Sequence, residues 1–180
     1  AIDQFILRGG RALLFVDPWA EVDQGGENPG DPMGGMGAGR SSNLDKLFGA
    51  WGISVTGDKF VGDDRYALRV GAPGEPPVRD IGLVGIDPDG LDKEDVVTAG
   101  LNILNFGFAG AISVADKAPA KLTPLVQSSD LAALVNTAPL GFMSDPSLLR
   151  ENFKPSGQRY TIAGRVSGKV PSAFPNGPPA

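Results

Sequence analysis

A stretch rich in glycine, proline and acidic residues, from Pro18 to Ser42, constrains the fold most because it interrupts the chain soon after its start. Connections this long without helix or strand are uncommon in compact domains. The stretch holds the densest run of the chain's 26 glycines and 16 prolines, a composition typical of flexible loops. We therefore expect a single α/β domain in residues 1–180, with a flexible loop at residues 18–42 and a coil at residues 167–180.

The chain contains neither histidine nor cysteine. This excludes a Ser-His-Asp triad, thiol nucleophiles, zinc or haem ligation by these residues, and any disulfide framework. Chemistry would have to come from carboxylates, lysine, arginine, tyrosine or hydroxyl groups, and the sequence supplies no base next to a hydroxyl nucleophile. We therefore expect no catalytic residue, no metal site and no cofactor.

The charge pattern also bears on the partners. With 16 basic and 21 acidic residues the net charge is −5, and the basic residues are scattered without a stripe or patch. Nucleic-acid binding needs a concentrated basic face, so we expect no nucleic-acid partner.

No window approaches the roughly 20 apolar residues of a membrane-spanning helix. The chain opens as if part-way through a helix and closes in proline-rich coil, so we expect it to be a truncated segment of a longer protein.

Hydrophobic periodicity predicts a mixture of helices and strands. The apolar run at residues 11–17 favours a strand covered on both faces, as in a parallel sheet. Ser42 or Asn43 is expected to cap the following helix, and Gly52 to end it. Strands dominate the later chain, which predicts an α/β fold with additional antiparallel strands. The expected helices lie at residues 1–8, 42–51, 92–101, 131–135 and from 145 onward, and the expected strands at residues 11–17, 53–56, 66–70, 81–86, 101–106, 111–114, 121–126 and 159–166.

Residues 34–41, with the letters GGMGAGRS, match the spacing of a phosphate loop except that Arg40 replaces the lysine. Glycine amides at the start of a helix can hold a phosphate group. A phosphate loop directly follows its strand, however, whereas Gly34 lies 17 positions beyond Asp17. We therefore interpret this segment as a flexible surface loop, with nucleotide binding as the weaker alternative.

Acidic residues gather within residues 87–95 and suggest a calcium site. The EF-hand pattern needs glycine at its sixth position and glutamate at its twelfth, and neither falls correctly here. A β-turn at residues 87–90, followed by a helix that Asp92 caps, explains these carboxylates without a metal ion. The polar clusters at residues 128–130 and 144–146 are likewise interpreted as helix caps, and the acidic pair at residues 63–64 is a poorer candidate still for a calcium site.

Asp17 and Trp19 are the strongest candidates for a ligand site. Asp17 ends the expected strand at residues 11–17, and open α/β sheets bind ligands beyond the carboxyl ends of their strands. Trp19 could offer a stacking surface or cover the base of the loop. Asp17 followed by proline is also a common way to end a strand, so a purely structural role is the simpler alternative.

Four segments give the chain a family resemblance. They are residues 1–18 (AIDQFILRGGRALLFVDP), 95–102 (DVVTAGLN), 123–129 (TPLVQSS) and 162–175 (IAGRVSGKVPSAFP). In this order they resemble the GldG-like auxiliary proteins of uncharacterised, gliding-motility-type ABC transport systems. Each segment is structural in character, and none is a catalytic signature.

The resemblance implies an extracytoplasmic (periplasmic) domain whose membrane-anchored parent works with a separate permease and ATPase. It also implies a Rossmann-like sandwich, similar to the class I glutamine amidotransferase-like group. The family supplies no catalytic residues to carry over.

From this resemblance and the missing histidine and cysteine we expect a non-catalytic auxiliary or substrate-binding-like component of a membrane ABC transport complex. A small-molecule or glycan ligand would be sought near Asp17 and Trp19. The alternatives are a module that binds carbohydrate or an envelope polymer, a hydrolase built on carboxylates, and a structural scaffold that contacts the permease. A carboxylate pair for glycoside hydrolysis stays open because its separation is spatial and not sequential.

Overall fold

The computed structural model describes residues 2–20, 22, 41–71, 74, 76–141 and 145–177. Strands predominate along these residues, and the helices are short. In chain order the elements are α1 (Ile2–Leu7), α2 (Asp45–Trp51), β1 (Ile53–Val55), β2 (Lys59–Asp63), β3 (Ala67–Val70), β4 (Val78–Ile86), β5 (Leu104–Gly107), β6 (Ile112–Val114), β7 (Ala120–Gln127), β8 (Ala132–Asn136), the 3₁₀ helix η1 (Ala138–Gly141), α3 (Pro146–Glu151) and β9 (Thr161–Gly168).

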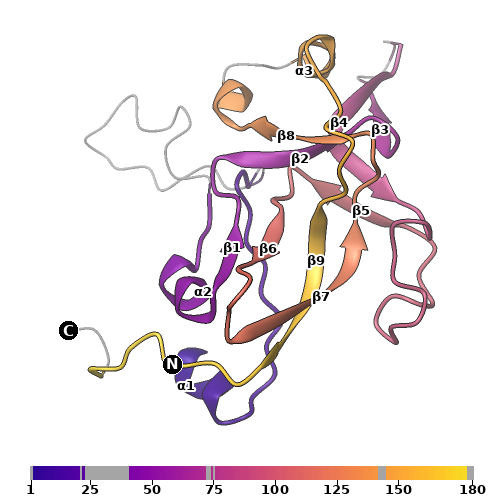
Figure 1. Ribbon diagram of the computed structural model, residues 1–180. Helices are drawn as coiled ribbons and strands as arrows, with labels where there is room; N and C mark the ends of the chain where they lie inside the picture. The colour runs from indigo at the N-terminus through magenta and orange to yellow at the C-terminus, as the bar shows by residue number, and fades with distance from the viewer. Residues whose placement is uncertain are drawn as a thin grey trace, which may run out of the picture.

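The strands form a four-stranded sheet in the order β1-β6-β9-β7, a three-stranded sheet β3-β4-β5 and the pair β2-β8. Figure 1 shows α2 beside the four-stranded sheet, and α3 at the opposite end near β3, β4 and β8. The strand pairings between these elements are all antiparallel. The mixed α/β prediction is confirmed, but a Rossmann-like or glutamine amidotransferase-like sandwich, which is built on a parallel sheet, is not confirmed.

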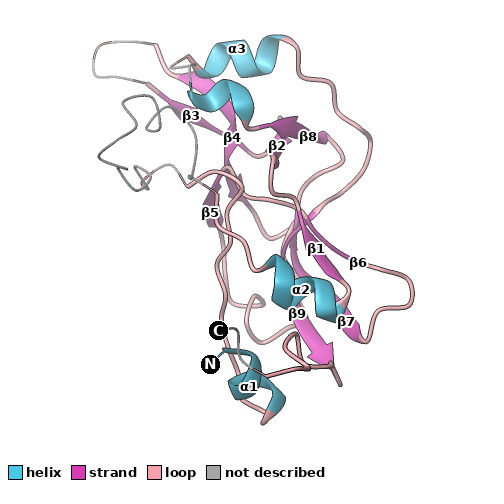
Figure 2. Ribbon diagram, turned by 90° about the vertical axis from the view of Figure 1, so that its left-hand side faces the viewer, coloured by secondary structure: helices cyan, strands magenta, loops and turns pink. Residues whose placement is uncertain are grey.

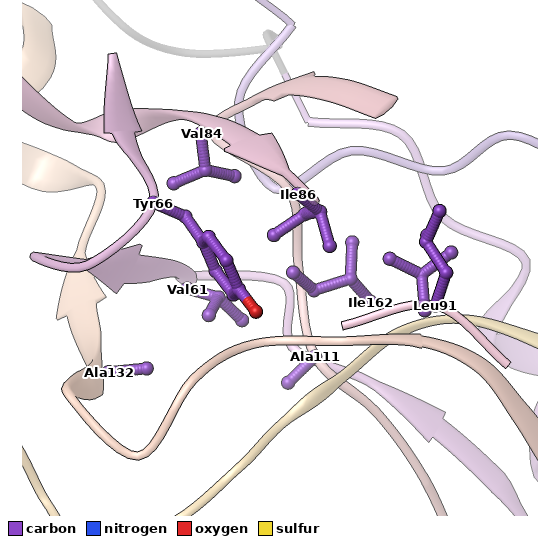
Figure 3. Close-up of a cluster of buried hydrophobic side chains, with 9 residues drawn as sticks. Val61, Tyr66, Val84, Ile86, Leu91, Ala111, Ala132 and Ile162 are labelled. Carbon is purple, nitrogen blue, oxygen red and sulfur yellow. The ribbon is translucent and has the colours of Figure 1, made fainter. Parts of the chain in front are cut away.

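One hydrophobic cluster joins the three sheets. It takes Val61 from β2, Val84 and Ile86 from β4, and Ile162 from β9, and all of these side chains are buried. Figure 3 shows them around the ring of Tyr66. Each fully buried aliphatic side chain contributes about 1.5–3 kcal/mol relative to an exposed one, so this cluster holds the sheets together.

A second cluster lies under α2, whose buried face consists of Leu47, Phe48 and Trp51, as the helical spacing predicts. Gly52 ends the helix in the left-handed conformation, at φ 71°, and its amide bonds to the carbonyls of the last turn. The predicted cap was wrong: Leu44 occupies the N-cap position, and no side chain makes a capping hydrogen bond.

The prediction of a strand at residues 11–17 was wrong. These residues form no helix or strand, and their apolar side chains alternate between two environments. Leu14 and Val16 pack on the cluster under α2, whereas Leu13 and Phe15 are 81% and 82% exposed. A short apolar run cannot distinguish a strand covered on both faces from an extended segment packed on one face.

Two predicted helical segments were also wrong. After Asp92 the chain makes hydrogen-bonded turns in place of a helix, with Val96 and Val97 exposed. The expected helical turn at residues 131–135 is strand β8, which pairs with β2. Strand β2 was not expected at all. Because β2 and β8 are short and lie about 70 residues apart, their pairing depends on contacts that local periodicity does not contain.

The remaining elements lie close to their predicted positions. Helix α3 begins after Asp145, whose side chain accepts a hydrogen bond from the amide of Ser147, as the predicted cap requires. Strand β9 pairs with β7 along most of its length, and β6 pairs with β1. The late part of the chain is therefore the antiparallel arrangement that the sequence predicts.

A buried acid in β4 gives a prediction for pH dependence. Asp80 accepts a hydrogen bond from the amide of Gly82, at 2.8 Å, but burial dominates and raises the pKa of its carboxyl group. A folded-state pKa above the unfolded value means that ionisation opposes folding, so this carboxyl group destabilises the fold as pH rises through the acidic range.

We therefore expect the free energy of unfolding of Asp80→Asn, relative to that of the natural chain, to increase as pH rises from 4.5 to 7.5. Urea unfolding of both proteins across that range measures the difference, and all other titrating groups cancel in it. If the new amide group costs a constant free energy at every pH, it shifts the difference in unfolding free energy but does not change how that difference varies with pH. A difference that stays level, or that narrows with pH, contradicts the prediction.

Candidate functional site

Trp19 lies in the protein interior. Its side chain is 7% exposed and belongs to a buried cluster with Phe60 and Phe108, whose rings meet edge to face at 5.2 Å. Partly buried aliphatic side chains from β4, β8, η1 and α3 pack around this cluster. The broad face of the indole is therefore part of the core, which leaves little of it to stack on a ligand.

Asp17 stands where the extended segment meets the residues that follow Arg40. Its amide donates to Ser42 Oγ, and its carbonyl accepts a hydrogen bond from the Ser42 amide, both at 2.9 Å. Partial burial raises the pKa of the Asp17 carboxyl group. The two ends of the glycine- and proline-rich stretch are thus tied to one another beside Asp17. The sequence predicted Asp17 at the carboxyl end of a sheet strand. The structure has no strand there, and Asp17 is held by its hydrogen bonds to Ser42.

Two cavities flank this connection. One, of about 320 Å³, is lined by Pro18, Trp19, Ser41, Gly57, Asp58, Thr137 and Ala138. The other, of about 240 Å³, lies toward α2 and shares Ser41 and Gly57 with the first. The first combines the edge of an indole with a carboxylate and two hydroxyl groups, the mixture of apolar surface and few polar groups that is typical of small-ligand sites.

The acidic segment at residues 87–95 is occupied by turns and ion pairs. The Asp87 carbonyl accepts a hydrogen bond from the Gly90 amide at 3.0 Å, which closes the predicted β-turn. Asp89 pairs with Arg65 at 2.7 Å, and this arginine holds the pKa of the carboxyl group below its usual value. Asp95 forms a two-pronged pair with Arg165. These contacts account for the carboxylates without a bound cation.

The structure gives a role to Asp63, which the sequence analysis set aside. Its carboxylate is fully buried and accepts four hydrogen bonds. The donors are the amides of Arg65 (2.9 Å), Tyr66 (3.2 Å) and Ser129 (2.6 Å), together with the Ser129 hydroxyl (2.8 Å). The prediction that residues 128–130 cap a helix was therefore wrong. This segment instead binds the carboxylate of Asp63, the last residue of β2, just before β8 begins.

A third cavity, of about 640 Å³, lies between the β3–β4 pair and α3 and gathers three of the scattered arginines. They are Arg69 from β3, Arg79 from β4 and Arg150 from α3, and Asp64 also lines this cleft. Arg150 Nε donates to the Asp64 carboxylate at 2.8 Å, which raises the pKa of Arg150. Strand pairing and the packing of α3 on β4 thus bring together arginines that are far apart in the chain.

The segment that resembles a phosphate loop, residues 34–41, lies outside the described residues except for Ser41, and so does most of the stretch predicted as a flexible loop. Within the described part of the chain, no group of three acidic residues is placed to hold a metal ion. No helix described here is long and apolar enough to cross a bilayer.

Comparison with protein-family models matches residues 1–180 to the auxiliary family described as ABC-type uncharacterized transport system. The chain belongs to this family. No curated protein and no solved structure matched the chain. The family match covers the whole chain and supports the general form of the resemblance given above, namely an auxiliary component of an ABC transport system.

The four segments that carry the resemblance to this transport family meet in the structure. Strand β9 pairs with β7, so the first part of residues 162–175, as far as Gly168, lies against residues 120–127. Arg165 of β9 holds Asp95 in residues 95–102. These contacts join three of the four segments into one structural unit.

Asp3 joins the first of these segments to the last. Its carboxylate accepts hydrogen bonds from the Ala173 amide (2.9 Å) and the Ser172 hydroxyl (2.8 Å), and these contacts lower its pKa. Trp51 Nε1 also donates to the Pro171 carbonyl, at 3.2 Å. These contacts hold α1 beside the segment that follows β9, at the end of the molecule that Figure 2 shows below the four-stranded sheet.

Proposed function

We propose that this transport-family member is a non-catalytic, substrate-binding-like component on the extracytoplasmic (periplasmic) face of the inner membrane. Its membrane-anchored parent would act with a separate permease and ATPase. The order of the four motifs favours the GldG-like, gliding-motility-type branch. Residues 1–180 would form a single domain of that parent.

The proposal that the protein is non-catalytic rests on the hydrogen bonds of its buried polar groups. Asp63 and Ser129 have the carboxylate and hydroxyl of a reactive pair, yet the carboxylate accepts four structural hydrogen bonds and the hydroxyl is one of the donors. A general base must reach the proton it abstracts from a substrate. A buried pair that fixes two strands favours a structural role over catalysis.

The ligand site that we propose is the cavity beside Trp19, and Asp17 adjoins it through the lining residue Pro18. Asp58, Thr137 and Ser41 offer polar groups there, and the backbone of Asp58 is fixed because its carbonyl accepts a hydrogen bond from the Thr137 amide at 2.9 Å. A small molecule or a glycan unit with several hydroxyl groups suits this lining.

The test of the complex is co-purification. The full-length parent, solubilised from membranes, should recover its permease and ATPase in fixed proportion, and the 180-residue chain should show no ATP binding by calorimetry. Binding of ATP at micromolar affinity would contradict the proposal, because energy is expected to enter through the separate ATPase. Recovery of the permease and ATPase, with no ligand found for the cavity beside Trp19, would favour the alternative that the protein is a structural scaffold.

A carbohydrate- or envelope-polymer-binding module is the second candidate, and the indole edge with its neighbouring hydroxyls favours it. On an array of bacterial envelope glycans, Asp58→Asn should weaken any signal about tenfold, the loss expected for one charge-assisted hydrogen bond. Asp130→Asn is the matched control, since this exposed residue adjoins the opposite end of the β2–β8 ladder. Equal loss in both variants would contradict a site at Asp58.

A hydrolase built on carboxylates is the weaker alternative. Such an enzyme needs two carboxylates facing a common space. The cavity beside Trp19 has one, Asp58, among its lining residues, and the arginine cleft has Asp64 and Glu151, of which Asp64 is held by Arg150. A screen with model glycosides and phosphoesters should therefore detect no turnover.

A further inference from the structure

The arginine cleft between β3, β4 and α3 contains an unfavourable arrangement of charge. In the register of the β3–β4 pair, Arg69 stands directly opposite Arg79. Side chains at opposed positions of an antiparallel pair lie about 5 Å apart at Cβ, and like charges there destabilise the sheet. Two arginines placed together in this way need compensation from another group.

The described residues supply little of that compensation. Arg79 donates through Nη2 to the backbone carbonyls of Asp64 and Arg65, but its Nε is buried without a hydrogen-bond partner. The guanidinium group of Arg69 forms no ion pair within the described part of the chain. The nearby carboxylate of Asp64 is already engaged by Arg150. Positive charge is therefore left over at the centre of the cleft.

The charge balance agrees with this conclusion. Three arginines and two carboxylates, Asp64 and Glu151, line the cleft, which gives a local balance of +1 in a chain whose net charge is −5. The guanidinium group is a planar fork of donors that matches the oxygens of carboxylates and phosphates. The cleft is thus suited to an oxyanion on a protein that otherwise repels anions.

The size and walls of the cleft indicate more than a simple inorganic ion. Its volume of about 640 Å³ lies within the range of small-molecule sites, about 300–1,000 Å³. Part of the lining is apolar, with Val78 next to Arg79 and Phe153 beyond α3. A ligand that fills this space would carry its oxyanion on an apolar body.

We propose that this cleft binds a small molecule whose carboxylate or phosphate group lies between Arg69 and Arg79, with its apolar body against Phe153. The cleft shares no lining residue with the cavities beside Asp17. The inference is therefore independent of the proposed function, and either can fail alone.

The experiment uses the 180-residue chain and three probes with the same aromatic body: phenyl phosphate, benzoate and the neutral benzyl alcohol. Titrations followed by the backbone amide signals of residues 69 and 78–80 should saturate with one or both anions and not with the alcohol. Phosphate alone, carboxylate alone, or both would support the proposal and identify the oxyanion. Saturation with the alcohol at the same affinity, or with none of the three, would overturn it.

Two arginine variants locate the effect. Arg69→Gln should weaken anion binding at least tenfold and, because it removes the like-charge contact, should shift the urea unfolding midpoint slightly upward. Arg8→Gln, an exposed arginine on the N-terminal side of the molecule, is the control and should change neither. A purely structural role for Arg69 predicts a lower midpoint. Equal loss of binding in both variants would show a general charge effect and overturn the proposal.

Discussion

Asp63→Ala should destabilise the protein by about 4 kcal/mol, because the change leaves several buried donors without an acceptor, each at a cost of about 1–3 kcal/mol. The amides of Arg65, Tyr66 and Ser129 all bond to this carboxylate, and no water reaches it because Asp63 is fully buried. Total stabilities of domains are about 5–15 kcal/mol, so the change should remove a large share. Equilibrium unfolding in urea measures it.

Two variants make this result specific. Asp63→Asn keeps the shape and the oxygen that faces Arg65 and Tyr66, but directs an amide group toward the Ser129 amide, so it should cost roughly half as much. Asp130→Ala removes an exposed acid nearby and should stay within about 0.5 kcal/mol of the natural chain. If Asp63→Ala unfolds at the same urea concentration as Asp130→Ala, the four hydrogen bonds do not anchor β2 to β8.

The elements that the sequence predicts well are those whose signals are local. Helix α2 shows its buried stripe at Leu47, Phe48 and Trp51, and Gly52 ends it in the conformation that favours glycine. Helix α3 follows the cap at Asp145. In both cases the deciding contacts lie within a few residues, which is the range that periodicity and capping preferences cover.

The errors concern elements whose structure depends on distant partners. Residues 132–136 have a composition that suits a helix as well as a strand, and they become β8 because β2 lies alongside. The apolar run at residues 11–17 has strand character but no strand partner among the described residues, and only Leu14 and Val16 of its inward face find a core. Tertiary contacts override local preference in both segments.

The candidate sites divide in the same way. Asp17 and Trp19 were chosen for their place at the end of a strand that does not form. Trp19 does line one cavity, whereas Asp17 lines neither of the two cavities nearby. The arginine cleft was not predicted because Arg69, Arg79 and Arg150 meet only through the β3–β4 register and the packing of α3 on β4. Alternation within the hairpin at residues 67–80 could have paired Arg69 with Arg79, but the bulge near Leu68 makes that register hard to infer.

Trp19→Ala should cost about 3–5 kcal/mol, the range for truncating a large aromatic side chain in a core. The indole fills the space beside Phe60 and Phe108, where the backbone leaves no slack: a Cβ atom at Gly82 would lie 2.4 Å from the Phe108 ring. The cluster cannot collapse into the vacated volume without moving β4. Urea unfolding, followed by far-UV circular dichroism so that the lost fluorophore does not matter, measures the effect.

Because Trp19→Ala is expected to destabilise the fold, ligand binding in this cavity has to be tested with other substitutions. Loss of ligand binding in Trp19→Ala would follow from unfolding alone, whereas Trp19→Phe keeps an aromatic ring and should cost clearly less than the alanine change. Asp58→Asn, at an exposed position lining the same cavity, should leave stability within about 0.5 kcal/mol and so reports on binding by itself. If Trp19→Ala were as stable as Asp58→Asn, the indole would not belong to the core. Stacking of Trp19 on a ligand would then again be the better interpretation.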